Sequence, residues 1–549
     1  MGERRPAFLL LVAAVVLLAP SLIFGNLISH SSPQNLTWAE QFAAQFRGGI
    51  PYPRVLPGSF DGLTAPTFYF YPPLAFWVDA LVSVATFNVI PTSYRLSLSS
   101  LLLLWASGMA MRFWLKGEAT SPRAALWGAL AYMAAPYHLL DHYYRGAYAE
   151  FAAFAVLPLV ALGVRRIANG ERWGPAVLAL SYAALPMAHL PTALLVSATM
   201  LPAYVLYRGW RFGDTARAAR FFIRCAVSGI LGLGIAAVYL LPALTLQDWI
   251  SPEVLWARDY VVDKWFLLTP DRWPRPIDMM LIIAACAVAY ALAAVGVMVA
   301  ATRVGELAGA RMEATFWATL SLVCLILVAG AVPWFWQLPF VAKVQFPWRL
   351  MSVVEFATVT ALCCVSWPLR SRVANYLVVA AIVVLVPGVG EMTAGIGLRI
   401  DVSRSQADVP ADVKEFLPAG YPLKPGGSYA ELNLEPVRDL PPAACTPTPR
   451  ICRASSEGFD RLRIELDADA PTTVVLRRFY YPMWRLDPEL PLVVTEPLRL
   501  VSFRAPSGRK VYSLERVAVR EERVGWAISA LALVLLLVWS GVEWGIRRP

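Results

Sequence analysis

Twelve long apolar runs constrain this chain more than any other feature of its sequence. About 20 helical residues are enough to cross the roughly 30 Å hydrocarbon core of a bilayer. Hydrophobic residues make up 58% of the chain and charged residues only 16%, whereas a soluble protein carries about a quarter charged residues. The sequence therefore predicts an α-helical polytopic membrane protein with about 12 transmembrane helices. The runs lie at residues 6–30, 95–115, 122–137, 149–164, 174–189, 190–207, 221–244, 278–301, 315–332, 350–367, 374–393 and 524–545.

The positions of the basic residues predict how these helices are oriented. Arg4 and Arg5 place the N-terminus in the cytoplasm, because basic residues are enriched in cytoplasmic loops. The run at 72–90 is expected to lie in the membrane interface, interrupted by Asp79, because counting it as a span would reverse every later loop. Every strongly basic short loop and both chain termini are then cytoplasmic, which accounts for the net charge of +10 without nucleic acid. These basic loops are residues 112–123, 165–172, 208–224, 303–311, 370–372 and 547–548.

Three long segments are predicted on the extracytoplasmic side, at residues 31–94, 246–277 and 396–523. The first two are loops of a transmembrane domain over 1–395, and a final helix with a cytoplasmic tail occupies 524–549. Residues 396–523 alternate apolar and polar side chains, as in RLRIELDADA and TTVVLRRFYY, which predicts a β-rich, sandwich-like domain. PSG at 506–508 is expected to form a hairpin turn. Cys445 and Cys452 flank a Pro-rich turn in this domain and are predicted to form a disulfide.

The first predicted outer loop is rich in Gly, Pro and aromatic residues. Arg54 lies in YPRV, and a guanidinium at the membrane surface suits a phosphate or pyrophosphate, which it grips with two parallel hydrogen bonds. Asp61 follows, and then the aromatic stretch that contains Tyr69 and Tyr71. Aromatic residues at this depth also serve as membrane anchors, so both interpretations remain open.

The second predicted outer loop, PYHLLDHYYRGAYAEFA, holds several ionisable residues between two apolar runs. Such residues at the membrane boundary favour a functional site. Asp141, Arg145 and Glu150 are candidates, and a structural salt bridge among them is the alternative. His138 and His142, four residues apart beside Asp141, are possible metal ligands. A divalent cation, Mg²⁺ or Mn²⁺, is therefore an open cofactor, and the metal-ligating residues are not determined.

A third charged stretch, KVQFPWRLMSVVE, places Lys343 and Arg349 at the outer end of a predicted span. Glu355 lies further along the same run. The two cations either help to bind an anionic lipid head group or place Arg349 at the interface in a pair with an acid.

These stretches, in their order along the chain, resemble a known family. QFRGGIPYPR with PTFYFYPPL, RGAYAEF, AHLPTAL at 188–194 and FPWRL at 346–350 are similar to bacterial membrane proteins labelled as related to 6-pyruvoyl-tetrahydropterin synthase. That family is similar to the GT-C superfamily of membrane glycosyltransferases. The C-terminal stretch from LRRFYYPMWRLDPELP to SLERV resembles the β-domain of related large membrane proteins.

The resemblance implies a GT-C-like fold and transfer, with inversion, of a sugar from a polyprenyl-phosphate donor. The acceptor would be an envelope glycan, lipid or protein outside the bacterial cytoplasmic (inner) membrane. Members carry an acid just after the first helix, but this chain has His30-Ser31-Ser32-Pro33-Gln34-Asn35 there. Either another carboxylate replaces that acid or the protein does not catalyse transfer. The candidate carboxylates are Glu40, Asp61, Asp141 and Glu150, and the candidate substrate-binding residues are Arg54, Arg145, Arg349, Lys343, Tyr69, Tyr71 and His142.

Two other functions stay open from the sequence. A transporter or flippase for a lipid-linked glycan would show paired half-repeats and charges near several helix centres, and neither is clear. A non-catalytic envelope assembly factor would fit the missing first-loop acid. No Walker-type phosphate loop or dinucleotide-binding fingerprint is present, which argues against ATP hydrolysis and dinucleotide redox chemistry.

Overall fold

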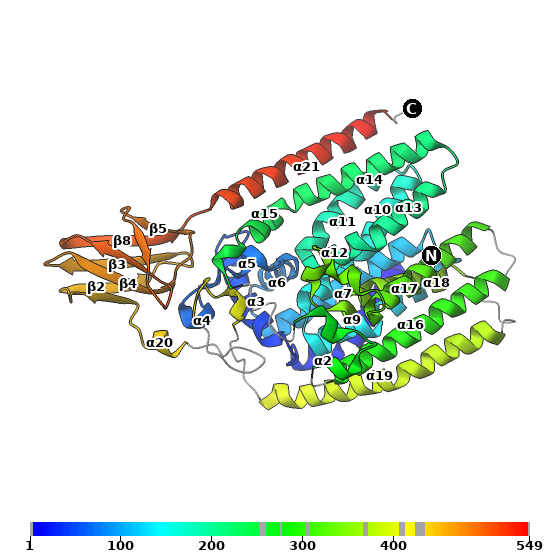
Figure 1. The fold of residues 1–549 in the computed structure, drawn as a ribbon, viewed down its shortest axis with the longest axis horizontal. Coiled ribbons are helices and arrows are strands. Elements are labelled where there is room, and N and C mark those ends of the chain that lie inside the picture. The colour runs from blue at the N-terminus through cyan, green and yellow to red at the C-terminus, as the bar shows by residue number, and fades with distance from the viewer. Residues whose placement is uncertain are drawn as a thin grey trace.

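The computed structural model describes residues 4–251, 260–274, 277–303, 308–365, 372–405, 412–422 and 434–546. Long, roughly aligned helices form a bundle, and a β-domain extends from one end of it (Figure 1). The bundle helices are α1 (Arg4–Leu17), α2 (Ala19–Phe24), α7 (Thr92–Leu115), α8 (Pro122–Met133), α10 (Tyr148–Ala168), α11 (Gly174–Ala188), α12 (Leu190–Ala198), α13 (Met200–Trp210), α14 (Thr215–Ile235), α15 (Ala237–Thr245), α16 (Asp278–Arg303), α17 (Ala308–Ala329), α18 (Met351–Cys363), α19 (Arg372–Ser405) and α21 (Arg520–Ile546).

Each of the twelve predicted apolar runs contains at least one of these helices. By length and hydropathy, 8 helices of the described chain are candidate membrane spans: α7, α10, α12 with α13, α14, α16, α17, α19 and α21. The helices in the other runs are shorter, with 14 residues in α1, 12 in α8, 15 in α11 and 13 in α18. The helical membrane class therefore holds, and the count of twelve spans stays a prediction.

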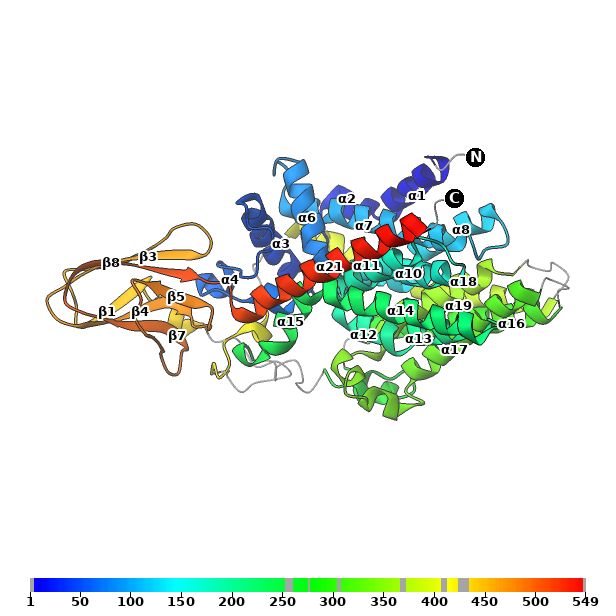
Figure 2. The same cartoon turned by 90° about the horizontal axis from the view of Figure 1, so that it is seen from above.

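The direction of the helices agrees with the predicted topology. α1 and α14 begin, and α16 and α21 end, toward the end of the bundle away from the β-domain (Figures 1 and 2). The β-domain and the basic loop between α13 and α14 are thus at opposite ends. Which end faces the cytoplasm stays a prediction, and residues 370–371 and 547–548 lie outside the described residues.

The first predicted outer loop forms several short helices near the β-domain end. They are α3 (Ser32–Arg47), α4 (Ser59–Gly62), α5 (Thr67–Phe70) and α6 (Leu74–Ala85). α3 and α6 stand across the direction of the long helices (Figure 2). Asp79 of α6 is fully buried, and its Oδ2 lies 3.0 Å from Nε of Arg95 in α7. The acid that interrupts the apolar run therefore pairs inside the protein, which ties α6 to the bundle.

The C-terminal β-domain consists of two four-stranded antiparallel sheets. Their strand orders are β1-β4-β7-β6 and β2-β3-β8-β5. The predicted alternation is present: Leu462, Ile464 and Leu466 of β3 are buried, whereas Arg461 and Arg463 between them are exposed. The strands are β1 (Ala443–Thr446), β2 (Ile451–Ser456), β3 (Arg461–Ala468), β4 (Thr472–Phe479), β5 (Trp484–Asp487), β6 (Leu492–Val494), β7 (Leu500–Ala505) and β8 (Gly508–Arg516).

Two sequence predictions about this domain need correction. β7 and β8 are not a hairpin pair, because β7 pairs with β4 and β6 whereas β8 pairs with β3 and β5. The PSG turn thus connects the two sheets. The predicted start of the domain at residue 396 falls inside α19, which continues to Ser405. The disulfide between Cys445 and Cys452 is present, with Cα atoms 6.3 Å apart.

The β-domain contacts the first outer loop through β4. The backbone N–H of Phe479 donates to the carbonyl of Leu63 at 2.8 Å, and Arg478 donates to Thr64 Oγ1 at 2.7 Å. The loop and the domain therefore form a joint cover over the end of the bundle where the functional candidates lie.

Thiol labelling of intact cells tests the predicted topology with two matched substitutions. Ala470 is an exposed residue of the β-domain, and Ala219 is exposed in the basic region at the start of α14. We expect Ala470→Cys to react with a membrane-impermeant maleimide and Ala219→Cys to react only after permeabilisation, because the predicted topology places the two positions on opposite sides of the bilayer. Labelling of Ala219→Cys in intact cells would contradict the orientation.

Candidate functional site

A buried group of charged side chains lies in the second outer loop. Here α9 (Pro136–Leu140) continues directly into η1 (Asp141–Arg145), which is a turn of π-helix. Such turns are rare and frequently occur at functional sites. Asp141 and Arg145 stand at the two ends of the turn, and Glu150 enters from the first turn of α10. These three residues are the charged cluster referred to below.

The Arg145 guanidinium connects the two carboxylates of the cluster. Its Nη1 lies 2.8 Å from Oε2 of Glu150 and also donates to Oδ1 of Asp141. The same nitrogen donates to the hydroxyl of Tyr137 at 2.9 Å, and that hydroxyl donates to Oε1 of Glu150 at 2.7 Å. Both carboxylates are almost completely buried. Two buried negative charges this close need the cation between them, because an unpaired buried charge is strongly destabilising.

The local sequence fixes the turn that follows Arg145. Gly146 has a φ of +60°, and a Cβ there would lie 2.3 Å from Oγ of Ser29. The side chain of Asn35 donates to the Gly146 carbonyl at 2.6 Å, and the N–H of Ser31 donates to the Arg145 carbonyl at 3.0 Å. The start of the first outer loop therefore rests directly on the segment that bears the cluster.

Two further elements reach Glu150 from the other side. Arg349 lies in η8 (Pro347–Leu350), with its Nε 3.5 Å from Glu150 Oε2. Its Nη1 donates to the carbonyl of Val344 at 2.7 Å. His189, immediately before α12, has its Nε2 3.9 Å from the same carboxylate oxygen, and its Nδ1 lies 2.8 Å from Thr192 Oγ1. Segments far apart in the sequence thus converge on one carboxylate.

The cluster retains unused hydrogen-bonding capacity. Among the residues that the structure describes, Oδ2 of Asp141 and Nε of Arg349 are buried without a hydrogen-bond partner. Buried polar atoms are nearly always satisfied in native proteins. The side chains of Arg145 and Arg349 are 11% and 12% exposed, against 0% for Asp141. The two cations therefore form the more accessible side of the cluster, called its rim below, and the unpartnered atoms leave capacity for further hydrogen bonds there.

The environment of Asp141 makes it a stronger base than an ordinary aspartate. Burial, together with the negative charge of Glu150, raises the pKa of Asp141 well above its usual range, although Arg145 opposes this shift. A carboxylate with a raised pKa holds a proton more tightly once it has accepted one. Asp141 is therefore suited to take a proton from a substrate hydroxyl.

Tyr71 lies beside the cluster on the first outer loop. Its ring contacts Trp38 at a centroid distance of 4.7 Å, and burial raises the pKa of its hydroxyl to about 12. Arg349 and Arg145 are close enough to oppose that shift. Tyr71 therefore stays a neutral hydroxyl next to the cationic rim, where it is available to a sugar or lipid.

The described residues do not assemble the possible metal site. His138 stacks on Phe154 at a centroid distance of 3.9 Å, and its Nδ1 lies 3.1 Å from the Tyr132 carbonyl. No group of three or more His, Cys, Asp or Glu side chains in the described part of the chain is placed to hold a metal ion. A cation between Asp141 and Glu150 does not fit either, because the Arg145 guanidinium holds that position. We therefore derive no step through Mg²⁺ or Mn²⁺.

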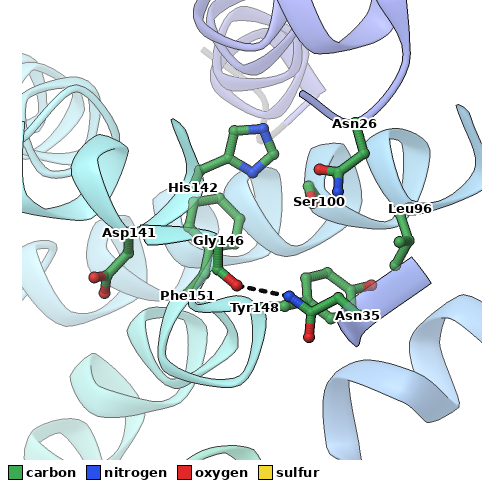
Figure 3. Close-up of a pocket in the computed structure, with 9 residues that line it drawn as sticks. All are labelled: Asn26, Asn35, Leu96, Ser100, Asp141, His142, Gly146, Tyr148 and Phe151. Atoms are coloured by element: carbon green, nitrogen blue, oxygen red, sulfur yellow. Dashed lines mark hydrogen bonds between the residues drawn. The ribbon is translucent and has the colours of Figure 1, made fainter. Parts of the chain in front are cut away.

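His142 faces away from the Asp141 carboxylate, toward a small cavity on the other side of the turn (Figure 3). Its Nε2 lies 2.8 Å from Oγ of Ser21. The cavity, which Asn26, Asn35, Ser100 and Tyr148 also line, has room for about one water molecule. We therefore assign His142 to the support behind the site, which corrects its predicted role in substrate binding.

Two predicted carboxylates lie elsewhere. Glu40 is half-exposed and pairs with Arg95 of α7 at 3.4 Å. Asp61 is exposed, and its Oδ2 lies 2.6 Å from Nη2 of Arg477 in β4. In the described structure neither carboxylate pairs with Arg145 or Arg349, so both lie outside the charged cluster, and their catalytic role stays a prediction.

Two other residues of the first outer loop that were predicted to bind substrate, Arg54 and Tyr69, make contacts inside the protein. Arg54 is buried, donates to the Val238 carbonyl at 2.6 Å and lies over the Tyr52 ring at 3.6 Å. Tyr69 donates its hydroxyl to Glu522 of α21 at 2.8 Å. The guanidinium of Arg54 thus makes its contacts inside the protein, with its Nε 4.0 Å from Oε1 of Glu522. Lys343, in η7 (Val341–Val344), is exposed and six residues before Arg349.

Sequence analysis missed two members of the site. Tyr137 follows Pro136 at the start of α9, and no pattern distinguishes its hydroxyl from the other tyrosines of the chain. His189 lies within AHLPTAL, a stretch noted only as part of the family resemblance. A histidine that interrupts an apolar run beside two prolines was the available signal for it.

The comparisons with known proteins give limited similarity. No protein-family model matches the chain, and no curated protein matches it. Two solved structures of the arabinofuranosyltransferase AftD from Mycobacteria are similar in part. One is 20% identical with a TM-score of 0.43 and covers 73% of this chain and 27% of that one. The other, a mutant, is 18% identical with a TM-score of 0.42 and covers 75% and 28%. This chain thus matches little more than a quarter of the length of AftD.

Removing the central cation tests how the site is held together. We expect Arg145→Met to lower the free energy of unfolding by about 3–5 kcal/mol, because it leaves two buried carboxylates unpaired. Chemical unfolding of the purified protein in detergent measures this. Arg485→Met is the matched control: it breaks an exposed pair with Glu489, which contributes about 0.5 kcal/mol or less. Equal effects of the two substitutions would contradict the role of Arg145.

Proposed function

We propose that this protein is a membrane glycosyltransferase that transfers a sugar from a polyprenyl-phosphate donor to a cell-envelope acceptor on the extracytoplasmic face. The observation that supports this most directly is the unpartnered Oδ2 of Asp141, which lies in a cluster whose accessible rim is formed by Arg145 and Arg349. Glycosyl transfer requires that combination, a base for the acceptor and cations for the leaving phosphate.

The proposed reaction uses each group once. The acceptor hydroxyl oxygen attacks the anomeric carbon of the sugar while Asp141 accepts its proton through Oδ2. The bond between the anomeric carbon and the phosphate oxygen breaks, and the polyprenyl phosphate leaves with the electron pair. Arg145 and Arg349 stabilise the charge on that phosphate, with Lys343 in support. Attack on the face opposite the leaving group inverts the anomeric configuration.

Glu150 has a supporting role in this scheme. Its carboxylate bonds Arg145 and Tyr137 and lies 3.5 Å from Arg349. It therefore neutralises and orients the two cations instead of receiving the acceptor proton. Tyr71 would contact the sugar or the first isoprene units, and the β-domain would help to select the acceptor.

The position of the site also favours a catalytic function over a transport function. Its charges lie together in η1 and the first turn of α10, against the start of the first outer loop. A flippase or transporter would need a polar path along the bundle. We place the protein in the bacterial cytoplasmic membrane with both termini in the cytoplasm, in keeping with α1 beginning and α21 ending at the end away from the β-domain.

Mass spectrometry of envelope glycans and glycolipids from a deletion strain tests the proposal. Rescue is compared for wild type, Asp141→Asn and Asp61→Asn, the last being the same chemical change at a carboxylate outside the cluster. We expect the deletion to remove a single-sugar mass that wild type and Asp61→Asn restore and Asp141→Asn does not, at equal protein abundance.

Three results would contradict the proposal. Full rescue by Asp141→Asn would exclude this group as the base. An unchanged glycan profile in the deletion strain would favour a non-catalytic assembly factor. Accumulation of an intact lipid-linked precursor would favour a flippase.

The raised pKa of Asp141 gives a second test. The base must be ionised, so kcat/KM falls as the pH drops through the pKa of Asp141 and is regained as the pH rises. Because that pKa is raised, we expect the acid limb of the profile to lie clearly above pH 4, about where an ordinary aspartate titrates. A pH series of initial rates with the purified protein measures it, and an acid limb at or below about pH 4 would contradict the assignment.

A further inference from the structure

Glu355 is a completely buried acid near the start of α18. An ionisable residue at such a position is expensive in a membrane protein and normally has a functional reason. The reaction proposed above does not use it. It is separated in sequence by about two hundred residues from Asp141, and no sequence pattern connects the two.

Both oxygens of Glu355 are engaged by donors from two other elements. Oε1 accepts the backbone N–H of Tyr137 at 2.8 Å and the hydroxyl of Tyr290, in α16, at 2.7 Å. Oε2 accepts the backbone N–H of His138 at 3.2 Å. Figure 1 shows α9 beside α16 and α18. The carboxylate therefore joins three elements at the start of α9.

The first turn of α9 cannot satisfy its own donors. The first backbone N–H groups of a helix have no partner within the helix, and a Ser, Thr, Asp or Asn before the helix usually accepts one of them. Here Ala135 precedes the helix and offers no side-chain acceptor. Pro136 has no N–H, so the donors of Tyr137 and His138 are the ones left over. Glu355 accepts both from a different helix, inside a bundle where water is not available to do so.

This contact leads directly to the charged cluster. Tyr137 is held through its backbone by Glu355 and through its hydroxyl by Glu150 and Arg145. α9 continues without a break into η1, which carries Asp141 and Arg145. A displacement of the first turn of α9 would therefore move the base and the rim cation together.

We propose that Glu355 is a positioning residue for the transfer reaction, which holds α9 and η1 so that Asp141 and Arg145 meet the substrate in the reactive geometry. The inference rests on the proposed function for the reaction itself, whereas the anchoring of α9 can be measured on its own. Three of the roughly four acceptor sites of its carboxylate are used in this contact, which is the arrangement of an anchor.

The test combines hydrogen–deuterium exchange with kinetics on the purified full-length protein in lipid nanodiscs. In Glu355→Gln, the carboxamide keeps the volume but turns an NH₂ toward one of its donors. We expect the backbone amides of residues 137–146 to exchange roughly 10-fold or more faster, because a hydrogen bond to a charged acceptor is lost. Transfer from a polyprenyl-phosphate sugar should show kcat reduced by about 10-fold or more with KM for the donor within about twofold.

Glu313→Gln is the matched control. Glu313 is also a buried acid of the bundle, in α17, but its carboxylate accepts from Arg208 and Arg211. It should change neither exchange at 137–146 nor kcat. If Glu355→Gln does not fold, Tyr290→Phe removes one of the three donors and should raise exchange and lower kcat by about two- to tenfold.

The outcomes separate this inference from the proposed function. Unchanged exchange at 137–146 in Glu355→Gln would overturn the anchoring of α9. Faster exchange with an unchanged kcat would overturn the positioning role. If the wild-type protein transfers no sugar, the proposed function fails, and the exchange measurement still decides whether Glu355 anchors α9.

Discussion

The charge balance around Arg145 is the interaction on which the rest of the site depends. Asp141 and Glu150 are both buried, and one guanidinium bonds to both. Without it, the two carboxylates would repel each other in a medium that screens charge poorly. The surrounding structure serves this contact: Gly146 permits the tight approach of the first outer loop, and Tyr137 and Arg349 complete the shell around Glu150.

The molecule uses buried arginines in two physically different ways. Arg54 and Arg95 act as internal ties: Arg54 donates to backbone carbonyls, and Arg95 pairs with Asp79. Arg145 and Arg349 instead reach the surface at the rim, next to a carboxylate oxygen that accepts no hydrogen bond in the described structure. The two groups differ in exposure: the side chains of Arg54 and Arg95 are 0% and 1% exposed, against 11% and 12% for Arg145 and Arg349. Of the two buried acids, Asp141 has an unpartnered oxygen, whereas both oxygens of Glu355 accept hydrogen bonds.

Sequence patterns predicted the parts of this protein that depend on local composition. The periodic burial of side chains produces both the apolar runs and the alternation at 461–520. The structure has helices in the apolar runs and β-strands in the alternating segment. Asp141, Arg145 and Glu150 were found because ionisable residues between two spans are conspicuous. Arg54, Asp61 and Glu40 were equally conspicuous, but their partners Val238, Arg477 and Arg95 come from other elements. Such partners depend on tertiary packing, which no spacing in one segment reveals. The pairing of β7 with β4, and not with β8, likewise depends on tertiary packing.

The chain lacks an acid after its first helix, and the packing explains how the site can be complete without one. Ser31 and Asn35, in the region where that acid would lie, bond to the carbonyls of Arg145 and Gly146. A carboxylate on either of the two touching segments can therefore approach the same volume. In this chain the carboxylate is that of Asp141, on η1. Asp141 is held by Arg145 and, through α9, by Glu355, so its position is set by the helical bundle and not by a surface loop. In the proposed reaction, a base fixed in this way would lose little conformational entropy when substrate binds, and burial raises its pKa in the direction that such a base requires.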